Sequence, residues 1–207
     1  MAYADAVAMY LAFAVSKTVD RNTSLCFWER PMDRLRGTFG RQVLSMVWDY
    51  AETNPFGGAG GDFLGAAHSL CEVLDQFVLE VPPGTVVQAD AQVQSISANK
   101  VVSSDPPYYD NIGYADLSDF FYVWLRSSLK SILPDNFATV AVPKSAELVA
   151  TPARHGGRDK AEAFFLEGMT HAMRRLAEQV HSEFPVAIYY AFKQAETTGL
   201  VGTASTG

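Results

Sequence analysis

The feature that most restricts the fold is an alternation of strand-like and helix-like segments in the second half of the chain. After Pro82-Pro83-Gly84, short runs rich in β-branched residues alternate with longer segments whose apolar residues recur every three or four positions. The expected strands are residues 85–89, 100–104, 137–142 and 186–192, and the expected helices are residues 116–132 and 161–184. Strands that alternate with helices usually form a parallel sheet covered by helices. We therefore predict an α/β fold with a mostly parallel sheet over residues 81–196.

The first part of the chain, residues 1–80, is expected to be a helical extension. Apolar residues at helical spacing predict helices over residues 2–19, 38–51 and 62–79. Thr38 and Asp62 stand where the second and third of these helices would be capped. Residues 20–37 are polar and interrupted by helix breakers, so they are predicted to be irregular. The tail, residues 197–207, is small and polar, and it is expected to be disordered.

The composition argues against a membrane span and a zinc site. The longest unbroken apolar run is the ten residues 6–15, whereas a helix that spans a bilayer needs about 20. Asp5 precedes this run and Lys17 follows it, which is the reverse of the order in a secretory signal. Cys26 and Cys71 have no cysteine or histidine at metal-binding spacing. We expect two ordinary thiols in a reducing cytoplasm, no metal and no membrane partner.

The charge is unevenly distributed along the chain. The net charge of −7 argues against a uniformly basic surface. Residues 17–41 and residues 121–160, however, each carry six basic and three acidic side chains, whereas residues 42–120 carry one basic and eleven acidic. A nucleic-acid partner therefore remains open along local basic patches, with solvated faces of unequal sign as the alternative. The loop Arg154–Lys160 is one such patch; it either contacts DNA phosphates or is an exposed mobile loop.

The segment with the most chemical content is Asp105-Pro106-Pro107-Tyr108, which follows the expected strand 100–104. Open α/β sheets bind ligands at the carboxyl ends of their strands. The exocyclic amine of a nucleobase is a poor nucleophile because its lone pair is delocalised into the ring. The Asp105 carboxylate and the Pro106 carbonyl oxygen can accept the two amine hydrogens and favour a tetrahedral nitrogen. Two prolines stiffen the loop, and Tyr108 offers a flat face for a base turned out of its stack.

The alternative interpretation of this segment is structural. A Pro-Pro turn can simply end a strand, and Asp105 would then be a solvated turn residue. The preceding strand, the second aromatic residue at Tyr109 and the expected position at a sheet edge favour the chemical interpretation.

The tetrapeptide Asp105-Pro106-Pro107-Tyr108 resembles the catalytic motif of amino-methyltransferases that modify DNA bases with S-adenosylmethionine. The longer segment Asp105 to Leu129 closely resembles large prokaryotic adenine-specific DNA methylases. The resemblance also reaches Asp20-Arg21-Asn22, residues 48–56 and residues 165–193, so it covers most of the chain.

The resemblance implies a Rossmann-like methyltransferase sheet, S-adenosylmethionine as cofactor and DNA as partner. It implies adenine N6 as the target, with cytosine N4 still open. Asp105 takes the role of amine acceptor and Tyr108 that of base-stacking residue, and the Pro106-Pro107 pair completes the catalytic motif. Asp90 resembles the acidic strand end near the adenine of the methyl donor, with a strand-terminating turn as the alternative. The chain then corresponds to the C-terminal catalytic region of a larger methylase.

The glycine-rich segment Asn54–Gly61 has two interpretations. By its letters it matches the Phe-x-Gly-x-Gly donor loop of such enzymes, which should follow a buried strand and precede a helix. The preceding residues 43–52 have helical spacing instead, and the donor loop of the large methylases lies far upstream of the matching region. A plain glycine-rich connector is the alternative, and we expect the chain by itself to bind the donor weakly.

Three functions remain open at this point. The first is transfer of a methyl group to a flipped adenine in DNA, without a covalent enzyme intermediate. The second is a non-catalytic nucleic-acid-binding or scaffolding fragment with an incomplete donor site. The third is methylation of an RNA base or a protein amide by the same motif.

Overall fold

The computed structural model describes residues 2–40, 43–44, 46–77, 81–110 and 112–190. The chain divides into two compact units, Met1–Gln88 with Gly113–Glu147 and Ala89–Ile112 with Leu148–Gly207. This grouping follows spatial contacts, and the predicted division into residues 1–80, 81–196 and 197–207 stays a prediction. The predicted tail lies outside the described residues.

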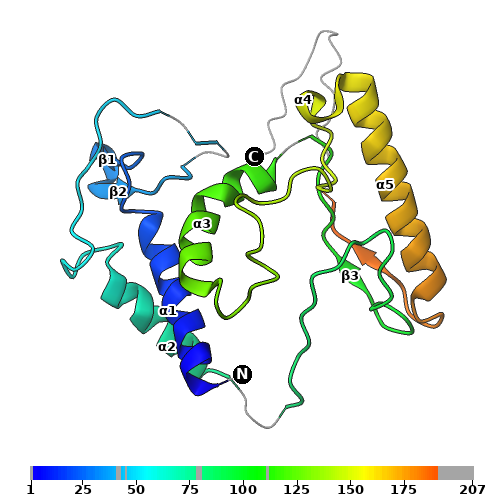
Figure 1. The fold of residues 1–207 in the computed structure, drawn as a ribbon, viewed down its shortest axis with the longest axis horizontal. Coiled ribbons are helices and arrows are strands. Elements are labelled where there is room, and N and C mark those ends of the chain that lie inside the picture. The colour runs from blue at the N-terminus through cyan, green and yellow to red at the C-terminus, as the bar shows by residue number, and fades with distance from the viewer. Residues whose placement is uncertain (1, 41–42, 45, 78–80, 111, 191–207) are drawn as a thin grey trace. The chain divides into compact units, whose positions relative to one another are not determined.

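Mixed α/β structure is present, as predicted (Figure 1). The first unit contains α1 (Tyr3–Val19), β1 (Phe27–Glu29), the 3-10 turn η1 (Arg30–Met32), β2 (Arg34–Arg36), α2 (Phe63–Asp75) and α3 (Tyr114–Leu129). The second unit contains β3 (Ser103–Ser104), α4 (Pro152–His155), α5 (Arg158–Gln179) and β4 (Ala187–Ile188). The four longer helices, α1, α2, α3 and α5, confirm four of the five helices that apolar spacing predicted.

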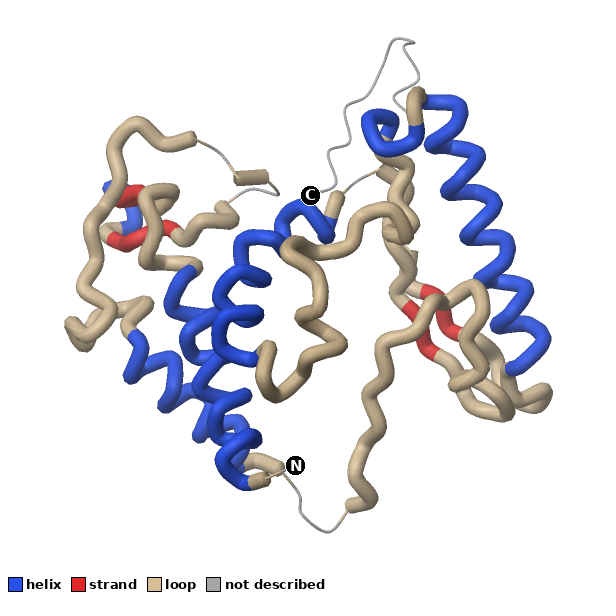
Figure 2. The backbone as a smooth tube through the Cα atoms, in the orientation of Figure 1, coloured by secondary structure: helices blue, strands red, loops and turns tan. Residues whose placement is uncertain are grey.

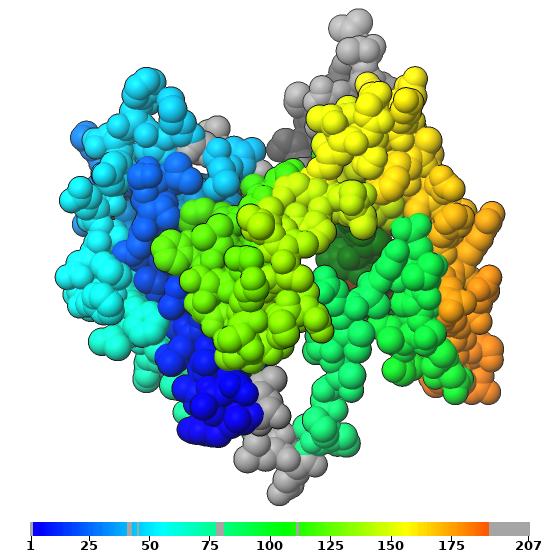
Figure 3. Space-filling view, in the orientation of Figure 1, coloured from blue at the N-terminus to red at the C-terminus, as the bar shows by residue number. Residues whose placement is uncertain are grey.

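The core of the first unit lies between α1, α3 and the segment after α3. Its buried residues are Ala12, Tyr122, Leu129 and Phe137. The small side chain at Ala12 lets α3 approach α1, and the two surfaces adjoin in the space-filling view (Figure 3). Helix α1 also packs against α2. A three-helix arrangement therefore forms from the N-terminal helices and a helix that the sequence placed in the α/β half.

Helix α2 begins where its cap residue predicts. The Asp62 side chain is buried, and its Oδ1 accepts a hydrogen bond of 2.7 Å from the Gly65 amide. Its Oδ2 accepts one of 3.2 Å from the Gly58 amide. One carboxylate thus satisfies a free amide of the first helical turn and also holds the preceding loop.

A hairpin within residues 20–37 is a departure from the irregular structure that was predicted there. Strands β1 and β2 pair antiparallel, with Phe27 opposite Arg36 and Glu29 opposite Arg34. The Glu29 carboxylate bonds to Arg34 at 2.7 Å and to Arg36 at 3.0 Å. These hydrogen bonds, that of Arg34 foremost, lower the pKa of Glu29. Cross-strand charge pairing of this kind stabilises a short strand pair.

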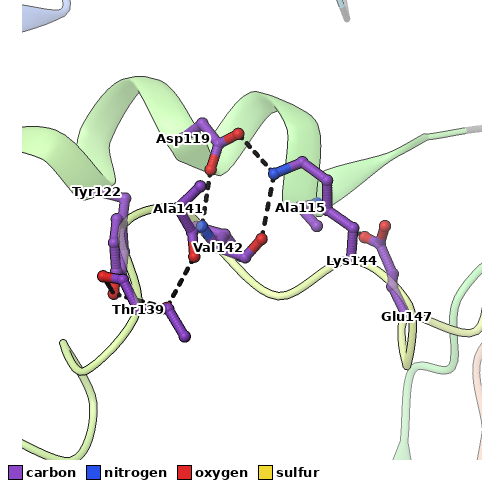
Figure 4. A network of polar contacts seen from close by, with 8 residues as sticks. All are labelled: Ala115, Asp119, Tyr122, Thr139, Ala141, Val142, Lys144 and Glu147. Carbon is purple, nitrogen blue, oxygen red and sulfur yellow. Dashed lines mark hydrogen bonds and ion pairs between the residues drawn. The ribbon is translucent and has the colours of Figure 1, made fainter.

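Two predicted elements of the first unit are wrong. The described residues of 38–51 form no helix. Thr38 does not act as a helix cap, because its hydroxyl donates a hydrogen bond of 2.8 Å to the Asp20 carbonyl oxygen. Residues 137–142 form no strand. They run along α3, where Asp119 and Tyr122 bond to their backbone (Figure 4).

The second unit is built on a parallel strand pair and the long helix α5. Ser103 pairs with Ala187 and Ser104 with Ile188. The buried residues Ala150, Ala161 and Phe165 form a separate core. Each strand is only two residues long (Figure 2).

The parallel direction predicted for the sheet is therefore present, but the predicted extent is not. Residues 85–89 form no strand, and all of them are exposed. Among the described residues the two sheets are both two-stranded, so a Rossmann-like sheet is not part of the described structure.

Candidate functional site

Asp105 follows directly after β3, at the carboxyl end of the parallel pair. The Ala187 amide donates to the Val102 carbonyl oxygen at 3.1 Å, and the Tyr189 amide donates to the Ser104 carbonyl oxygen at 2.8 Å. Since the two strands run in the same direction, the residues that follow both strands leave the pair at the same edge. This is the kind of edge at which α/β proteins place ligand-binding loops.

The motif brings Asp105 and Tyr108 into direct contact. The Tyr108 hydroxyl donates a hydrogen bond of 2.6 Å to Asp105 Oδ1. Asp105 is exposed, whereas Pro106, Pro107 and Tyr108 are half-buried. Within the described part of the chain, Asp105 Oδ2 accepts no hydrogen bond. The carboxylate therefore faces solvent with one oxygen engaged by the motif's own tyrosine.

A second aromatic ring, Tyr190, lies against Tyr108. The two ring centroids are 5.5 Å apart and the rings are nearly perpendicular, at 88°. Tyr190 comes two residues after β4, and 41% of its surface is exposed. The site thus consists of one carboxylate and two tyrosine rings that the parallel pair brings together.

Sequence analysis missed Tyr190. The predicted strand 186–192 contained Tyr189-Tyr190, so the aromatic pair was read as part of the strand and not as residues beyond its end, where Tyr108-Tyr109 stands relative to the other strand. Both aromatic pairs stand just beyond strand-forming residues, and parallel pairing brings such positions to the same edge.

Tyr109 has a structural role, although in the sequence it counted in favour of the chemical interpretation of the motif. Its carbonyl oxygen accepts a hydrogen bond of 2.9 Å from the Ala150 amide. Its ring meets Phe165 edge-to-face, with centroids 5.3 Å apart. Its φ of 35° lies in the left-handed region, which is unfavourable for a bulky residue and needs support from surrounding contacts. Tyr109 therefore anchors the carboxyl side of the motif to the core of the second unit.

Asp90 is an exposed residue at the start of a turn, and the described residues directly before it, 81–89, form no strand. Its Oδ1 accepts a hydrogen bond of 2.9 Å from the Gln92 amide. Its carbonyl oxygen accepts bonds from the amides of Val93 and Gln94. No described contact joins Asp90 to the motif. The geometry fits the turn interpretation, and the proposed cofactor role of Asp90 stays a prediction.

The glycine-rich segment Asn54–Gly61 belongs to the first unit. It leads into α2 and borders a cleft of about 320 Å³ that is also lined by Lys17 and Arg21. At Gly61, whose φ is 98°, an added Cβ would lie 2.9 Å from the Arg21 side chain. The described residues before the segment, 46–53, contain no strand. The segment precedes a helix as a donor loop should, but it does not follow a strand.

The basic loop Arg154–Lys160 includes the end of α4 and the start of α5. Gly156 and Gly157 have φ values of 73° and 131°, so they make the turn between the helices. The His155 ring stacks on Phe164 at 4.1 Å. The loop is therefore shaped by local packing, and its proposed contact with phosphates stays a prediction.

Comparison with protein-family models, with curated proteins and with solved structures finds no significant match. Within the described residues no group of three or more histidine, cysteine, aspartate and glutamate side chains could hold a metal ion. Every helix in the described part of the chain is too short or too polar to cross a bilayer.

Proposed function

We propose that the chain is the catalytic-motif region of an adenine-N6 DNA methyltransferase that uses S-adenosylmethionine. The observation that carries the proposal is the position of Asp105 and Tyr108 at the carboxyl end of a parallel strand pair, in direct contact with each other. The resemblance of this motif to amino-methyltransferases supports it. A Rossmann-like sheet belongs to the same proposal, with β3 and β4 as two of its strands.

The residues of the motif act by positioning. The Asp105 carboxylate and the Pro106 carbonyl oxygen accept the two hydrogens of the base amine, which directs the nitrogen lone pair away from the ring. Tyr108 stacks on the base and compensates for the contacts it loses in leaving the duplex. S-adenosylmethionine, when bound, supplies an electrophilic methyl group.

The residues of this chain do not fit a complete donor site. Asp90 Oδ1 is engaged by its own turn, and the glycine-rich segment packs against Arg21 and Asp62 without a strand before it. We therefore propose that donor binding involves the remainder of a larger methylase chain. Polar groups left unpaired in a partial site cost about 1–3 kcal/mol each, so the chain itself should bind the donor far more weakly than the micromolar range.

Calorimetry with S-adenosylmethionine tests this expectation directly. A low-micromolar dissociation constant would contradict it and would identify Asn54–Gly61 as the donor loop. Millimolar or absent binding agrees with it.

Methyl transfer is tested with tritium-labelled donor at high concentration and adenine-containing duplex DNA. Asp105→Ala should reduce the rate by about 10²–10³, the usual effect of removing one preorganised electrostatic contact. Asp110→Ala is the matched control, because Asp110 is an exposed aspartate on the same loop and has no role in the proposal. Undiminished transfer by the Asp105 variant would reject the mechanism. Competition by RNA and by peptide amides separates DNA from the other substrates.

A second candidate is a non-catalytic nucleic-acid-binding or scaffolding fragment. The glycine-rich segment favours it, because a complete donor loop should follow a strand. DNA binding by a chain that neither binds donor nor transfers methyl groups would favour this candidate over the first.

A further inference from the structure

Two basic side chains line the cleft beside the glycine-rich segment of the first unit. The cleft has a volume of about 320 Å³, and it is lined by Lys17, Arg21, residues 59–62 and the first half of α2. Lys17 lies in the last turn of α1, and Arg21 lies just beyond the end of this helix. Among the described residues, neither side chain has an ion-pair or hydrogen-bond partner. The cleft therefore carries two cations whose charge is not used by a neighbouring carboxylate.

The acidic residue that lines the same cleft, Asp62, is engaged by backbone amides. Its carboxylate oxygens accept hydrogen bonds of 2.7 Å from Gly65 and 3.2 Å from Gly58. Only 8% of its surface is exposed, so it competes little for a ligand in the cleft. The Gly65 amide is already bonded to Asp62, and the start of α2 therefore adds little attraction for an anion. That attraction comes from Lys17 and Arg21.

The Arg21 side chain is held against the glycine-rich segment. A Cβ added at Gly61 would lie 2.9 Å from both Cβ and Cδ of Arg21, and one added at Gly60 would lie 3.9 Å from Nη1. The aliphatic stem thus lies across Gly61. Asn22 Nδ2 donates a hydrogen bond of 2.9 Å to the Gly61 carbonyl oxygen, and the Thr53 hydroxyl donates one of 3.2 Å to the Arg21 carbonyl oxygen. A guanidinium group positioned in this way loses less conformational freedom when a ligand binds.

Backbone donors adjoin the two cations. The amides of Gly60 and Gly61 make no hydrogen bond within the described part of the chain, and both residues line the cleft. Guanidinium, ammonium and backbone amide groups are the donors with which proteins bind phosphate. We propose that this cleft binds a phosphate group through Arg21, Lys17 and the Gly60–Gly61 backbone. The group belongs either to a nucleic-acid backbone or to a free phosphate compound, and its binding does not depend on methyl transfer.

Amide chemical shifts of the isotope-labelled 207-residue chain test the site. Inorganic phosphate is added at pH 7 and constant ionic strength, with potassium chloride as the reference. The Gly60 and Gly61 amides should shift and reach saturation in the unchanged chain. Arg21→Met keeps an aliphatic stem on Gly61 and removes the guanidinium, so it should weaken phosphate binding by about tenfold or more.

Two lysine variants accompany this measurement. Lys17→Met should also weaken phosphate binding, by about three- to tenfold, because it removes the second cation of the cleft. Lys130→Met is the matched control, since Lys130 is an exposed residue at the end of α3 and does not line the cleft. It should bind phosphate as the unchanged chain does. The dispersion of the amide spectrum establishes that each variant is folded.

A short DNA duplex distinguishes the two sources of the phosphate group. If the group belongs to a nucleic-acid backbone, the duplex should shift the same Gly60 and Gly61 amides, and inorganic phosphate should compete with it. Arg21→Met should then lower the slope of log binding constant against log salt by about one, whereas Lys130→Met should not. If phosphate shifts these amides and the duplex does not, the cleft takes a free phosphate compound.

Three results would overturn the proposal. The first is that neither phosphate nor DNA shifts the Gly60 and Gly61 amides. The second is that Arg21→Met and Lys17→Met bind phosphate as tightly as Lys130→Met does. The third is that S-adenosylmethionine shifts these amides and phosphate does not, which would favour the donor-loop interpretation instead.

Discussion

Replacing Asp119 by alanine should destabilise the first unit by about 2 kcal/mol. Asp119 lies on α3, and its Oδ1 accepts a hydrogen bond of 2.8 Å from the Val142 amide. Its Oδ2 accepts one of 2.6 Å from Lys144 Nζ. Figure 4 shows both contacts joining the helix to the loop that follows it. A backbone bond to a charged acceptor contributes about 1.5 kcal/mol, and a partly exposed ion pair about 0.5 kcal/mol.

The same contacts make this contribution depend on pH. The Lys144 hydrogen bond, and after it the Val142 amide, hold the pKa of Asp119 below its ordinary value of 3.8. A lowered pKa in the folded state means that the carboxylate stabilises the fold above the unfolded pKa. This stability is lost as the pH falls through the folded pKa. The difference between the unchanged chain and Asp119→Ala should therefore be full near neutral pH and shrink in strongly acidic solution.

Urea unfolding followed by tryptophan fluorescence is a suitable assay. The three tryptophans, Trp28, Trp48 and Trp124, all belong to the first unit, so their emission reports on that unit. Lys144→Met is the matched control, because it removes the ion pair and leaves the Val142 amide bonded to Asp119. It should cost less than about 1 kcal/mol. Equal losses from both substitutions, or a loss that does not change with pH, would refute the assignment of most of the energy to the backbone bond.

The remaining predictions concern a helix cap and a close contact. Asp62→Ala should cost about 1–2 kcal/mol because the Gly65 and Gly58 amides lose their acceptor, whereas Asp62→Asn should cost less; equal urea midpoints for both would contradict the capping role. Gly168→Ala should destabilise the second unit by about 1 kcal/mol, since the added Cβ would collide with the Leu148 side chain and outweigh the gain in helix propensity. Leu148→Ala in the same chain should recover part of this loss, and circular dichroism during thermal unfolding measures both.

The helices were predictable because their signals are local. Apolar spacing and the Asp62 cap predicted α2, and the same spacing predicted α3 and α5 to within a few residues at most ends. The failures share a cause. Thr38 looks like a cap in sequence, but Asp20 provides its partner from a distant turn. Residues 137–142 look like a strand, but side chains of α3 bond to their backbone and replace a strand partner.

The same distinction between local signals and distant partners applies to the candidate site. Asp105 and Tyr108 are three positions apart, so their contact follows from the local geometry of the motif, and the residue types alone suggested their chemistry. Tyr190 reaches Tyr108 only because β4 pairs with β3. That pairing joins residues that are far apart in the chain, and no local pattern encodes it. The proposed acceptor could therefore be predicted from the sequence, whereas the ring that packs against Tyr108 is placed there by strand pairing. A substitution that disturbs this pairing without touching the motif should impair the site through Tyr190.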